Sequence, residues 1–216
     1  MKIVYPSVEL LKGPKYDDLL KFIEKVGRTC YKSEDKITAE SAENFVRGLI
    51  KRGHLAMIEH ETITVKFVCD RGVSHELVRH RLASFAQEST RYCNYSGDQF
   101  GREITVIQPC WLEKPEDGYP ETTDWDVWAQ AMEDAEEKYM ELLDMGWSPQ
   151  QARTVLPNSL KTEVVVTMNI REWRHFFNLR AIGTTGAPHP QMKQVAWLAF
   201  DMFKENWPVF FEDLEG

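Results

Sequence analysis

Two strand-forming stretches constrain the fold of this chain most strongly. TITVKFVC (residues 62–69) alternates β-branched or apolar side chains with others, and LKTEVVVTMNI (160–170) is a second β-branched run. MKIVYPSVELL at the start and ITVIQP (104–109) are further strand candidates. Helical patterns separate these strands without regular βαβ alternation. We therefore expect an α+β fold with a mostly antiparallel central sheet flanked by helices, in a single domain spanning residues 1–216.

Apolar residues at helical spacing predict the helices. Their approximate bounds are 16–26, 38–52, 73–81, 125–143, 148–155, 171–180 and 192–205. Asp124 is the expected N-cap of the longest helix, and Gly53 the expected stop of the second. Residues 110–124, with Pro115, Gly118 and Pro120, predict a surface loop.

Composition limits the partners of the chain. A net charge of −8 over 216 residues argues against broad binding to nucleic acid or an anionic membrane, since such binding needs surplus Lys and Arg. The four cysteines are isolated, which is typical of reduced thiols in a cytoplasmic protein. No signal peptide is recognisable, and no apolar run approaches the ~18 residues of a membrane span. We expect a cytoplasmic protein, in the host cytoplasm if the chain is viral.

Cations gather in RHRLASFAQESTRY (79–92) despite the acidic total. Residues 71–91 hold four arginines against two glutamates. Glu76, Arg79 and His80 have i, i+3, i+4 spacing, so a helix reaching residue 81 would place them on one face. One interpretation is a pocket for an anionic ligand. The other is a helix end, where the backbone carbonyls favour cations.

The end of this segment, residues 89–91, and the separate segment QQARTVLP offer groups that bind phosphate. Ser89 and Thr90 supply hydroxyl groups, and Arg91 supplies a guanidinium that can hold a phosphate through two hydrogen bonds. Arg153, in QQARTVLP, is a further candidate, although a single arginine in a short helix is commonly a plain surface residue. Ser89 has the position of a nucleophile, but no histidine–acid pair accompanies it, so we expect phosphate binding.

A third cluster spans a strand end and the next helix. It consists of Asn169, Arg171, Arg174, His175, Asn178 and Arg180. Amide, imidazole and guanidinium groups together can bind the carbonyl and imide edges of a heteroaromatic ring. The alternative is a solvated helix face whose aromatic residues belong to the core. No HExxH or Cys/His spacing occurs, so no metal site is expected, and no GxSxG, GxxxxGK[ST] or GxGxxG motif is found.

These segments carry a family resemblance. From His75 to Arg91 the chain fits HELVRHRxxSFxQxSxR, which resembles the signature of the flavin-dependent thymidylate synthases, or thymidylate synthase complementing proteins. GHLAMIEH, ARTVLP and TMNIREWRHFFNLR resemble three further motifs of that family, in the same order. The four motifs are distributed over most of the chain, from residue 53 to residue 180.

The resemblance implies a fold, a reaction and a set of site residues. The enzymes make dTMP from dUMP, with 5,10-methylenetetrahydrofolate as carbon donor and FAD, reduced by NADPH, as hydride donor, in homotetramers with shared active sites. FAD-binding residues implied by the resemblance are His54, Arg79, His80, Arg81, Gln87, Asn169, Arg171 and His175. The implied dUMP-binding residues are Glu76, Arg79, Gln87, Glu88, Ser89, Thr90, Arg91, Arg153 and Arg180.

Arg180 is the expected catalytic residue, because it matches the family's arginine at the uracil ring. Uracil must become electron-rich at C5 to attack a one-carbon unit, and a guanidinium at the N3/O2 edge stabilises that charge. Some positions depart from the family pattern. Ala56 stands where a hydroxyl residue can contact FAD, and His189 and Gln191 lie in a segment that does not align.

Other functions are compatible with the same residues. One is a flavin- or folate-dependent methyltransferase acting on another pyrimidine nucleotide, and another is a non-catalytic nucleotide-binding module. RNA binding through the RHR segment is disfavoured by the acidic total charge.

Overall fold

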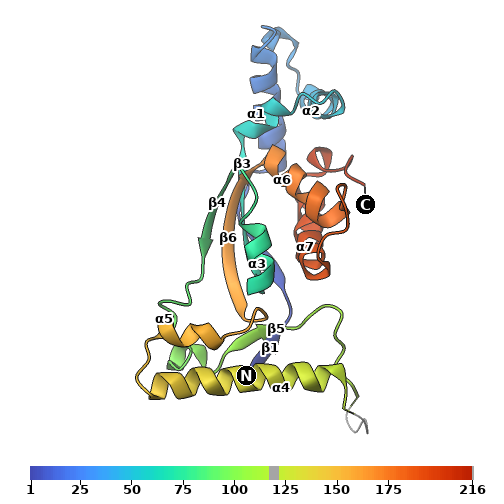
Figure 1. The fold of residues 1–216 in the computed structure, drawn as a ribbon. Helices are drawn as coiled ribbons and strands as arrows, with labels where there is room; N and C mark the ends of the chain where they lie inside the picture. The colour runs from blue at the N-terminus through green and yellow to red at the C-terminus, as the bar shows by residue number, and fades with distance from the viewer. Residues whose placement is uncertain (117–121, 216) are drawn as a thin grey trace. The chain divides into compact units, whose positions relative to one another are not determined.

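The computed structural model describes residues 1–116 and 122–215, and its chain divides into two compact units (Figure 1). Unit 1 consists of Met1–Ser7, Phe67–Arg79 and Ala86–Val164. Unit 2 consists of Val8–Lys66, His80–Phe85 and Val165–Gly216. One domain over the whole chain stays a prediction. Of the predicted loop at 110–124, Gly118 and Pro120 lie outside the described residues.

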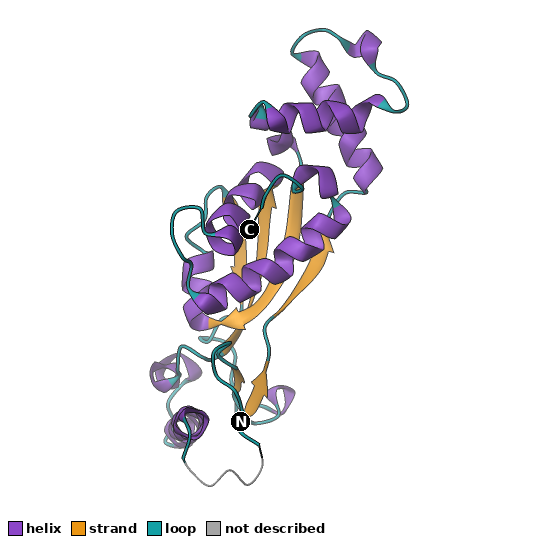
Figure 2. Ribbon diagram, turned by 90° about the vertical axis from the view of Figure 1, so that its right-hand side faces the viewer, coloured by secondary structure: helices purple, strands orange, loops and turns teal. Residues whose placement is uncertain are grey.

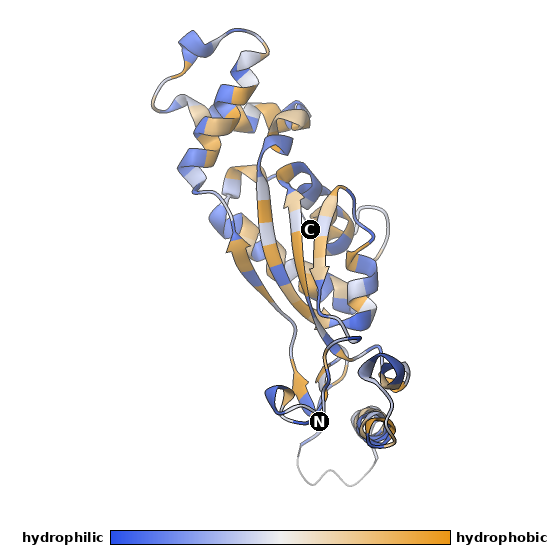
Figure 3. Cartoon of the chain, turned by 90° about the vertical axis from the view of Figure 1, so that its left-hand side faces the viewer, coloured by the Kyte–Doolittle hydropathy of each residue, from blue (hydrophilic) through white to orange (hydrophobic). Residues whose placement is uncertain are grey.

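Four strands form the main sheet, in the order β2-β3-β6-β4. They are β2 (Ser7–Lys12), β3 (Thr62–Asp70), β4 (Ala83–Gln87) and β6 (Lys161–Asn169). Along β3 and β6, buried and half-buried residues alternate, as predicted, and Figure 3 shows the orange apolar residues recurring along these strands. Helices cover one face of the strands (Figure 2), so the α+β prediction, with a mixed antiparallel sheet flanked by helices, is confirmed.

The N-terminal stretch forms two strands instead of the single strand predicted. β1 (Lys2–Val4) pairs in parallel with β5 (Thr105–Ile107) in a separate two-stranded sheet, and β2 belongs to the main sheet. Pro6 lies between β1 and β2 and has no N–H to donate to either ladder. β4 was not predicted, because its residues belong to the cationic segment.

Unit 1 is built on the long helix α4 (Asp124–Asp144), with α3 (Arg71–Leu77), α5 (Pro149–Ala152), η3 (Asp98–Phe100) and η4 (Arg153–Val155). Its apolar core is formed by Tyr95, Ile104, Val106, Met132, Tyr139, Ala152 and Leu160. The N-cap of α4 is Thr123, one residue before the predicted Asp124. A capping box explains the difference, because Thr123 and Asp126 exchange backbone-to-side-chain hydrogen bonds.

The prediction that the helix continues to residue 81 was wrong. Helix α3 ends at Leu77. The Val78 amide still donates to the Ser74 carbonyl four residues back, whereas the Arg79 amide donates to the Glu76 carbonyl only three residues back, as in a 3₁₀-type turn. The chain is extended again at β4. Glu76, Arg79 and His80 therefore do not share a helix face.

Unit 2 is mostly helical. It contains α1 (Tyr16–Thr29), η1 (Glu34–Lys36), α2 (Ser41–Lys51), η2 (Leu55–His60), α6 (Ile170–Phe177), η5 (Asn178–Ile182), α7 (Pro190–Asn206) and η6 (Pro208–Phe210). Buried aromatic rings pack α6 against α7. The centroid of the Phe203 ring lies 4.9 Å from that of Trp173 and 5.1 Å from that of Phe177. The predicted helix at 171–180 ends instead in η5, a π-helical turn that carries Arg180.

Candidate active site

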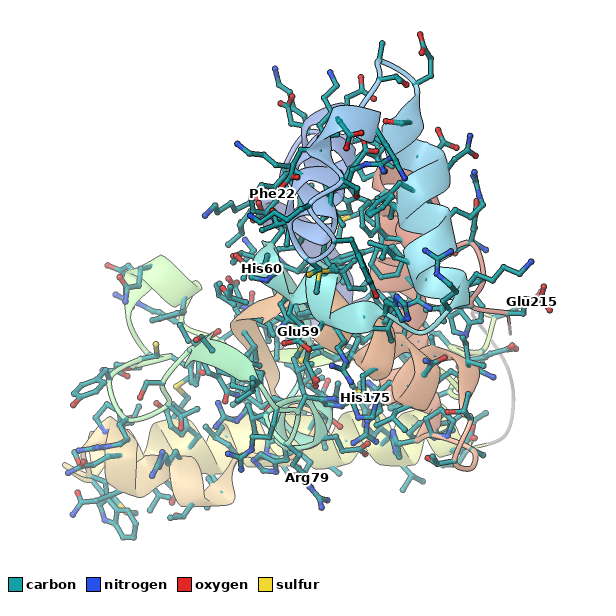
Figure 4. All side chains as sticks on the ribbon, turned by 90° about the horizontal axis from the view of Figure 1, so that it is seen from above. Phe22, Glu59, His60, Arg79, His175 and Glu215 are labelled. Atoms are coloured by element: carbon teal, nitrogen blue, oxygen red, sulfur yellow. The ribbon has the colours of Figure 1, made fainter. Side chains whose placement is uncertain are left out.

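Unit 2 contains a pocket of about 520 Å³, a volume suited to a cofactor-sized ligand. It is lined by Leu55, Glu59, Arg81, Leu82, Asn169, Arg171, Glu172, Arg174, His175 and Asn178. These residues come from η2, the turn after His80, the end of β6, α6 and the start of η5, and Figure 4 labels Glu59 and His175 among them. The pocket gathers four residues that the resemblance assigns to FAD, namely Arg81, Asn169, Arg171 and His175.

The start of α6 fixes the polar groups of this pocket. The side-chain oxygen of Asn169 caps the helix by accepting from the Glu172 amide at 2.9 Å, so its NH₂ group is the part that can donate to a ligand. Arg171 donates to Glu59 at 2.5 Å, and both side chains are exposed. His175 is exposed one turn further along α6.

His80 differs from its two arginine neighbours, because it is buried and uncharged. Its Nε2 atom accepts a hydrogen bond from Nε of Arg180 at 3.1 Å, and its ring packs edge-on against Phe176 at 5.0 Å. Burial, with Arg180 and His175 nearby, lowers the pKa of His80 to about 4. Of the three RHR residues, Arg79 and Arg81 are therefore exposed, whereas His80 is buried and neutral.

Arg174 lines the same pocket, but its guanidinium is paired with a carboxylate of the protein itself. Its two Nη atoms form a fork onto Asp213, with both distances 2.7 Å, and it also donates to the Phe210 carbonyl. Only 7% of this residue is exposed. Arg174 therefore anchors the C-terminal segment.

His54 lies in a different pocket of unit 2. That pocket, of about 300 Å³, is lined by Gly27, Cys30, Tyr31, Leu49, His54, Ala56 and Met57. The structure does not place His54 among the residues lining the larger pocket, and Ala56 adds no polar group to the smaller one.

Unit 1 brings together the residues predicted to bind phosphate. Nη1 of Arg153 donates to Oγ1 of Thr90 at 3.1 Å, although 63 residues separate the two in the sequence. Thr90 is buried, whereas the guanidinium-bearing residues Arg153 and Arg91 are exposed. The Ser89 hydroxyl accepts from the Arg91 amide at 3.3 Å. Hydroxyl and guanidinium groups thus lie together on the loop after β4, which carries Ser89, Thr90 and Arg91, and on η4, which carries Arg153.

Gln87 and Glu88 bond mainly to other residues of unit 1. Gln87 donates to Ser74 at 2.9 Å and Thr162 at 3.2 Å. The Glu88 carboxylate accepts from the Tyr95 hydroxyl and from Lys161, both at 3.0 Å. Both side chains hold the loop in place.

The remaining predicted residues, Glu76 and Arg79, also belong to unit 1. Glu76 is half-buried on α3, and Arg79 is exposed just beyond that helix, where Figure 4 labels it. Within residues 1–116 and 122–215, no three His, Cys, Asp or Glu side chains gather as metal ligands would. None of the helices in these ranges is long and apolar enough to cross a bilayer.

Sequence reasoning missed two acidic residues of the pocket, Glu59 and Glu172. Glu172 follows Asn169 by three residues, which is the spacing of a helix-capping pair, so its sequence position is explained without a site. The signal that distinguishes it is burial, since one carboxylate oxygen, Oε1, is inaccessible and has no hydrogen-bond partner among the described residues.

Known proteins resemble this chain in sequence. Residues 15–209 match the family described as "Thymidylate synthase complementing protein". A flavin-dependent thymidylate synthase of Corynebacterium aurimucosum is 34% identical over 88% of this chain and 78% of its own. One from Geobacter sulfurreducens is 35% identical over 71% of this chain and 65% of its own.

A solved structure has a similar fold. The UMP/dUMP methylase PolB from Streptomyces cacaoi, bound with 5-Br dUMP, superposes with a TM-score of 0.78 at 26% identity. The match covers 98% of this chain and 96% of that one. The chain thus belongs to the thymidylate synthase complementing protein family, and the two relatives named above are flavin-dependent thymidylate synthases.

Proposed function

We propose that this chain is a flavin-dependent thymidylate synthase, which methylates dUMP to dTMP. The observation that carries the proposal is the 520 Å³ pocket, because it gathers Arg81, Asn169, Arg171 and His175 from separate parts of the sequence. Membership of the family supports both the flavin and the dUMP substrate.

The pocket residues fit a flavin dinucleotide. Two exposed guanidinium groups, from Arg81 and Arg171, suit the diphosphate of FAD. The Asn169 amide and the His175 imidazole suit the polar edge of a flavin ring. When bound, the flavin supplies the hydride, and this chain binds and orients it. We assign His54 to the same reaction by resemblance, together with 5,10-methylenetetrahydrofolate as carbon donor and NADPH as reductant.

We assign the phosphate of dUMP to the cluster in unit 1. Ser89, Thr90, Arg91 and Arg153 supply hydroxyl and guanidinium donors there, and Gln87 and Glu88 hold the loop that carries them. Glu76 and Arg79 follow by resemblance. Ser89→Ala should weaken dUMP binding and leave measurable turnover, whereas complete, irreversible inactivation would instead indicate a nucleophile.

Arg180 is the residue we assign to the chemical step. Its hydrogen bond to His80 orients the guanidinium, which can then stabilise negative charge on the uracil N3/O2 edge as C5 attacks the one-carbon unit. The proton on C5 leaves afterwards, and reduction completes the methyl group. Because His80 is neutral, it accepts this hydrogen bond without competing for the substrate's charge.

One observation favours a second candidate, a methylase that also takes UMP. PolB is described as a UMP/dUMP methylase, so uridine nucleotides need a direct comparison. The test uses purified protein, which should be yellow with bound flavin and should oxidise reduced flavin when dUMP and 5,10-methylenetetrahydrofolate are added together. Oxidation with UMP at a similar rate would support the second candidate. Bound nucleotide with no oxidation would instead show a non-catalytic binding module.

Assembly and location complete the proposal. We propose a homotetramer in which subunits share active sites, within the cytoplasm. Native mass measurement and analytical ultracentrifugation test the assembly, and a monomer as active as the bulk enzyme would contradict it.

A further inference from the structure

Glu172, on the first turn of α6, is a half-buried acid that the proposed reaction does not use. Its side chain is 12% exposed, and its Oε1 atom has no hydrogen-bond partner within the described part of the chain. Burial raises the pKa of Glu172, although His175, the Arg81 backbone amide and Arg171 partly oppose this effect. An unpaired buried carboxylate oxygen destabilises a fold, so its position calls for a reason.

The nearest candidate partner is His80, in the same unit. Glu172 Oε1 lies 3.7 Å from Nδ1 of His80. On the other side of the ring, Nε2 accepts from Nε of Arg180 at 3.1 Å. An arginine N–H can only donate, so Nε2 must carry a lone pair, and the single proton of the neutral ring must then be on Nδ1. The ring nitrogen that carries the proton is therefore the one 3.7 Å from Glu172 Oε1.

We propose that Glu172 is a positioning residue for Arg180, acting through His80. Its carboxylate favours the proton of His80 on Nδ1, and Nε2 therefore remains an acceptor that holds the Arg180 guanidinium in one orientation. Without this charge the proton can occupy Nε2, where it faces the Arg180 Nε–H as one donor against another. The catalytic consequence rests on the proposed role of Arg180, but the state of His80 does not.

The competing explanation is structural. Glu172 lies in the first turn of α6, where a carboxylate stabilises the helix dipole whatever histidine is nearby. Replacing it would then lower stability alone. A measurement of the His80 ring separates the two explanations.

Nitrogen-15 NMR of the unliganded protein, labelled at histidine, reports which ring nitrogen carries the proton. In the wild type, His80 should show a protonated Nδ1 and an unprotonated Nε2. Glu172→Ala should move a substantial fraction of His80 to the Nε2-protonated form. Glu172→Gln keeps the shape without the charge, should give a smaller change, and serves if the alanine variant does not fold.

The matched control is Glu59→Ala. Glu59 is an acid that lines the same pocket, but it contacts Arg171 at 2.5 Å and has no recorded contact with His80 among the described residues. Its removal should leave the His80 signals unchanged. An unchanged His80 ring in both Glu172 variants would overturn the proposal, as would an equal change in Glu59→Ala.

Kinetics supply the second readout. Glu172→Ala should lower kcat about tenfold, the worth of one hydrogen bond, with KM for dUMP changed less than twofold. In a His80→Phe background the same substitution should have no further effect on kcat, and full additivity would contradict the proposal. If the wild type shows no dUMP-dependent turnover, the proposed function fails, and the NMR comparison still decides the role of Glu172.

Discussion

Replacing Arg153 with alanine should weaken binding of dUMP through its phosphate alone. Arg153 is exposed, and its side chain donates the 3.1 Å hydrogen bond to Thr90, so the fold should depend little on it. A hydrogen bond to a charged group contributes about 1.5–3 kcal/mol, and exposure to water favours the lower half of that range. The dissociation constant for dUMP should therefore rise roughly 10- to 40-fold. Losing the Thr90 contact should lower the Tm by only about 2–4 °C.

Calorimetric titration with dUMP and with deoxyuridine provides the assay. Deoxyuridine lacks the phosphate, so Arg153→Ala should leave its affinity almost unchanged. Arg153→Lys keeps the charge but loses the fork, and should fall between the wild type and alanine. Equal losses for dUMP and deoxyuridine would refute the phosphate assignment, because Arg153 would then act by shaping unit 1. No loss for either ligand would place it outside the site.

Three further predictions follow from unit 2. Arg180→Ala should lower kcat by about 10²–10³-fold at saturating dUMP, because it removes a group that stabilises developing charge. The rate of flavin oxidation in a single turnover measures this loss, and an unchanged rate would remove Arg180 from the chemical step. Arg174→Met should lower the free energy of unfolding by about 2 kcal/mol in denaturant titrations, because Arg174 is buried while its partner Asp213 is 45% exposed. A loss of flavin binding without any loss of stability would instead make Arg174 a flavin ligand. The pKa of His80 is lowered from 6.5 to about 4, so the folded state binds fewer protons than the unfolded state, and the free energy of unfolding should fall by up to about 3 kcal/mol from pH 6.5 to 4. His80→Phe should flatten this decline, and an unaltered slope would mean that folding does not lower the pKa of His80.

Local sequence patterns predicted much of the fold because the spacing of apolar residues reflects which side chains are buried. The alternation in 62–69 predicts β3, and the β-branched run at 160–170 predicts β6. The same patterns failed where a tertiary contact decided the outcome. The apolar spacing after residue 73 continues past Leu77, but α3 ends there, and the next residues place His80 in the interior of unit 2.

The chemistry of the pocket was only partly readable in the sequence. Spacing grouped Arg171, Arg174 and His175 on α6, but it did not show that Arg174 bonds to Asp213, 39 residues later. Likewise, RHR reads as three cations, and burial makes the central one neutral. The pairing of Arg174 and the neutral state of His80 both depend on which segment packs against which face of a helix. Residues far apart in the sequence determine that packing together.

The central claim is that this chain methylates C5 of dUMP, and release of tritium from [5-³H]dUMP tests it most directly. The C5 hydrogen must leave as the new carbon–carbon bond is completed, so the label should enter water when FAD, NADPH and 5,10-methylenetetrahydrofolate are all present. Arg180→Ala should slow this release by the factor predicted above. Absence of tritium release from the wild type in every combination of these compounds would contradict the account.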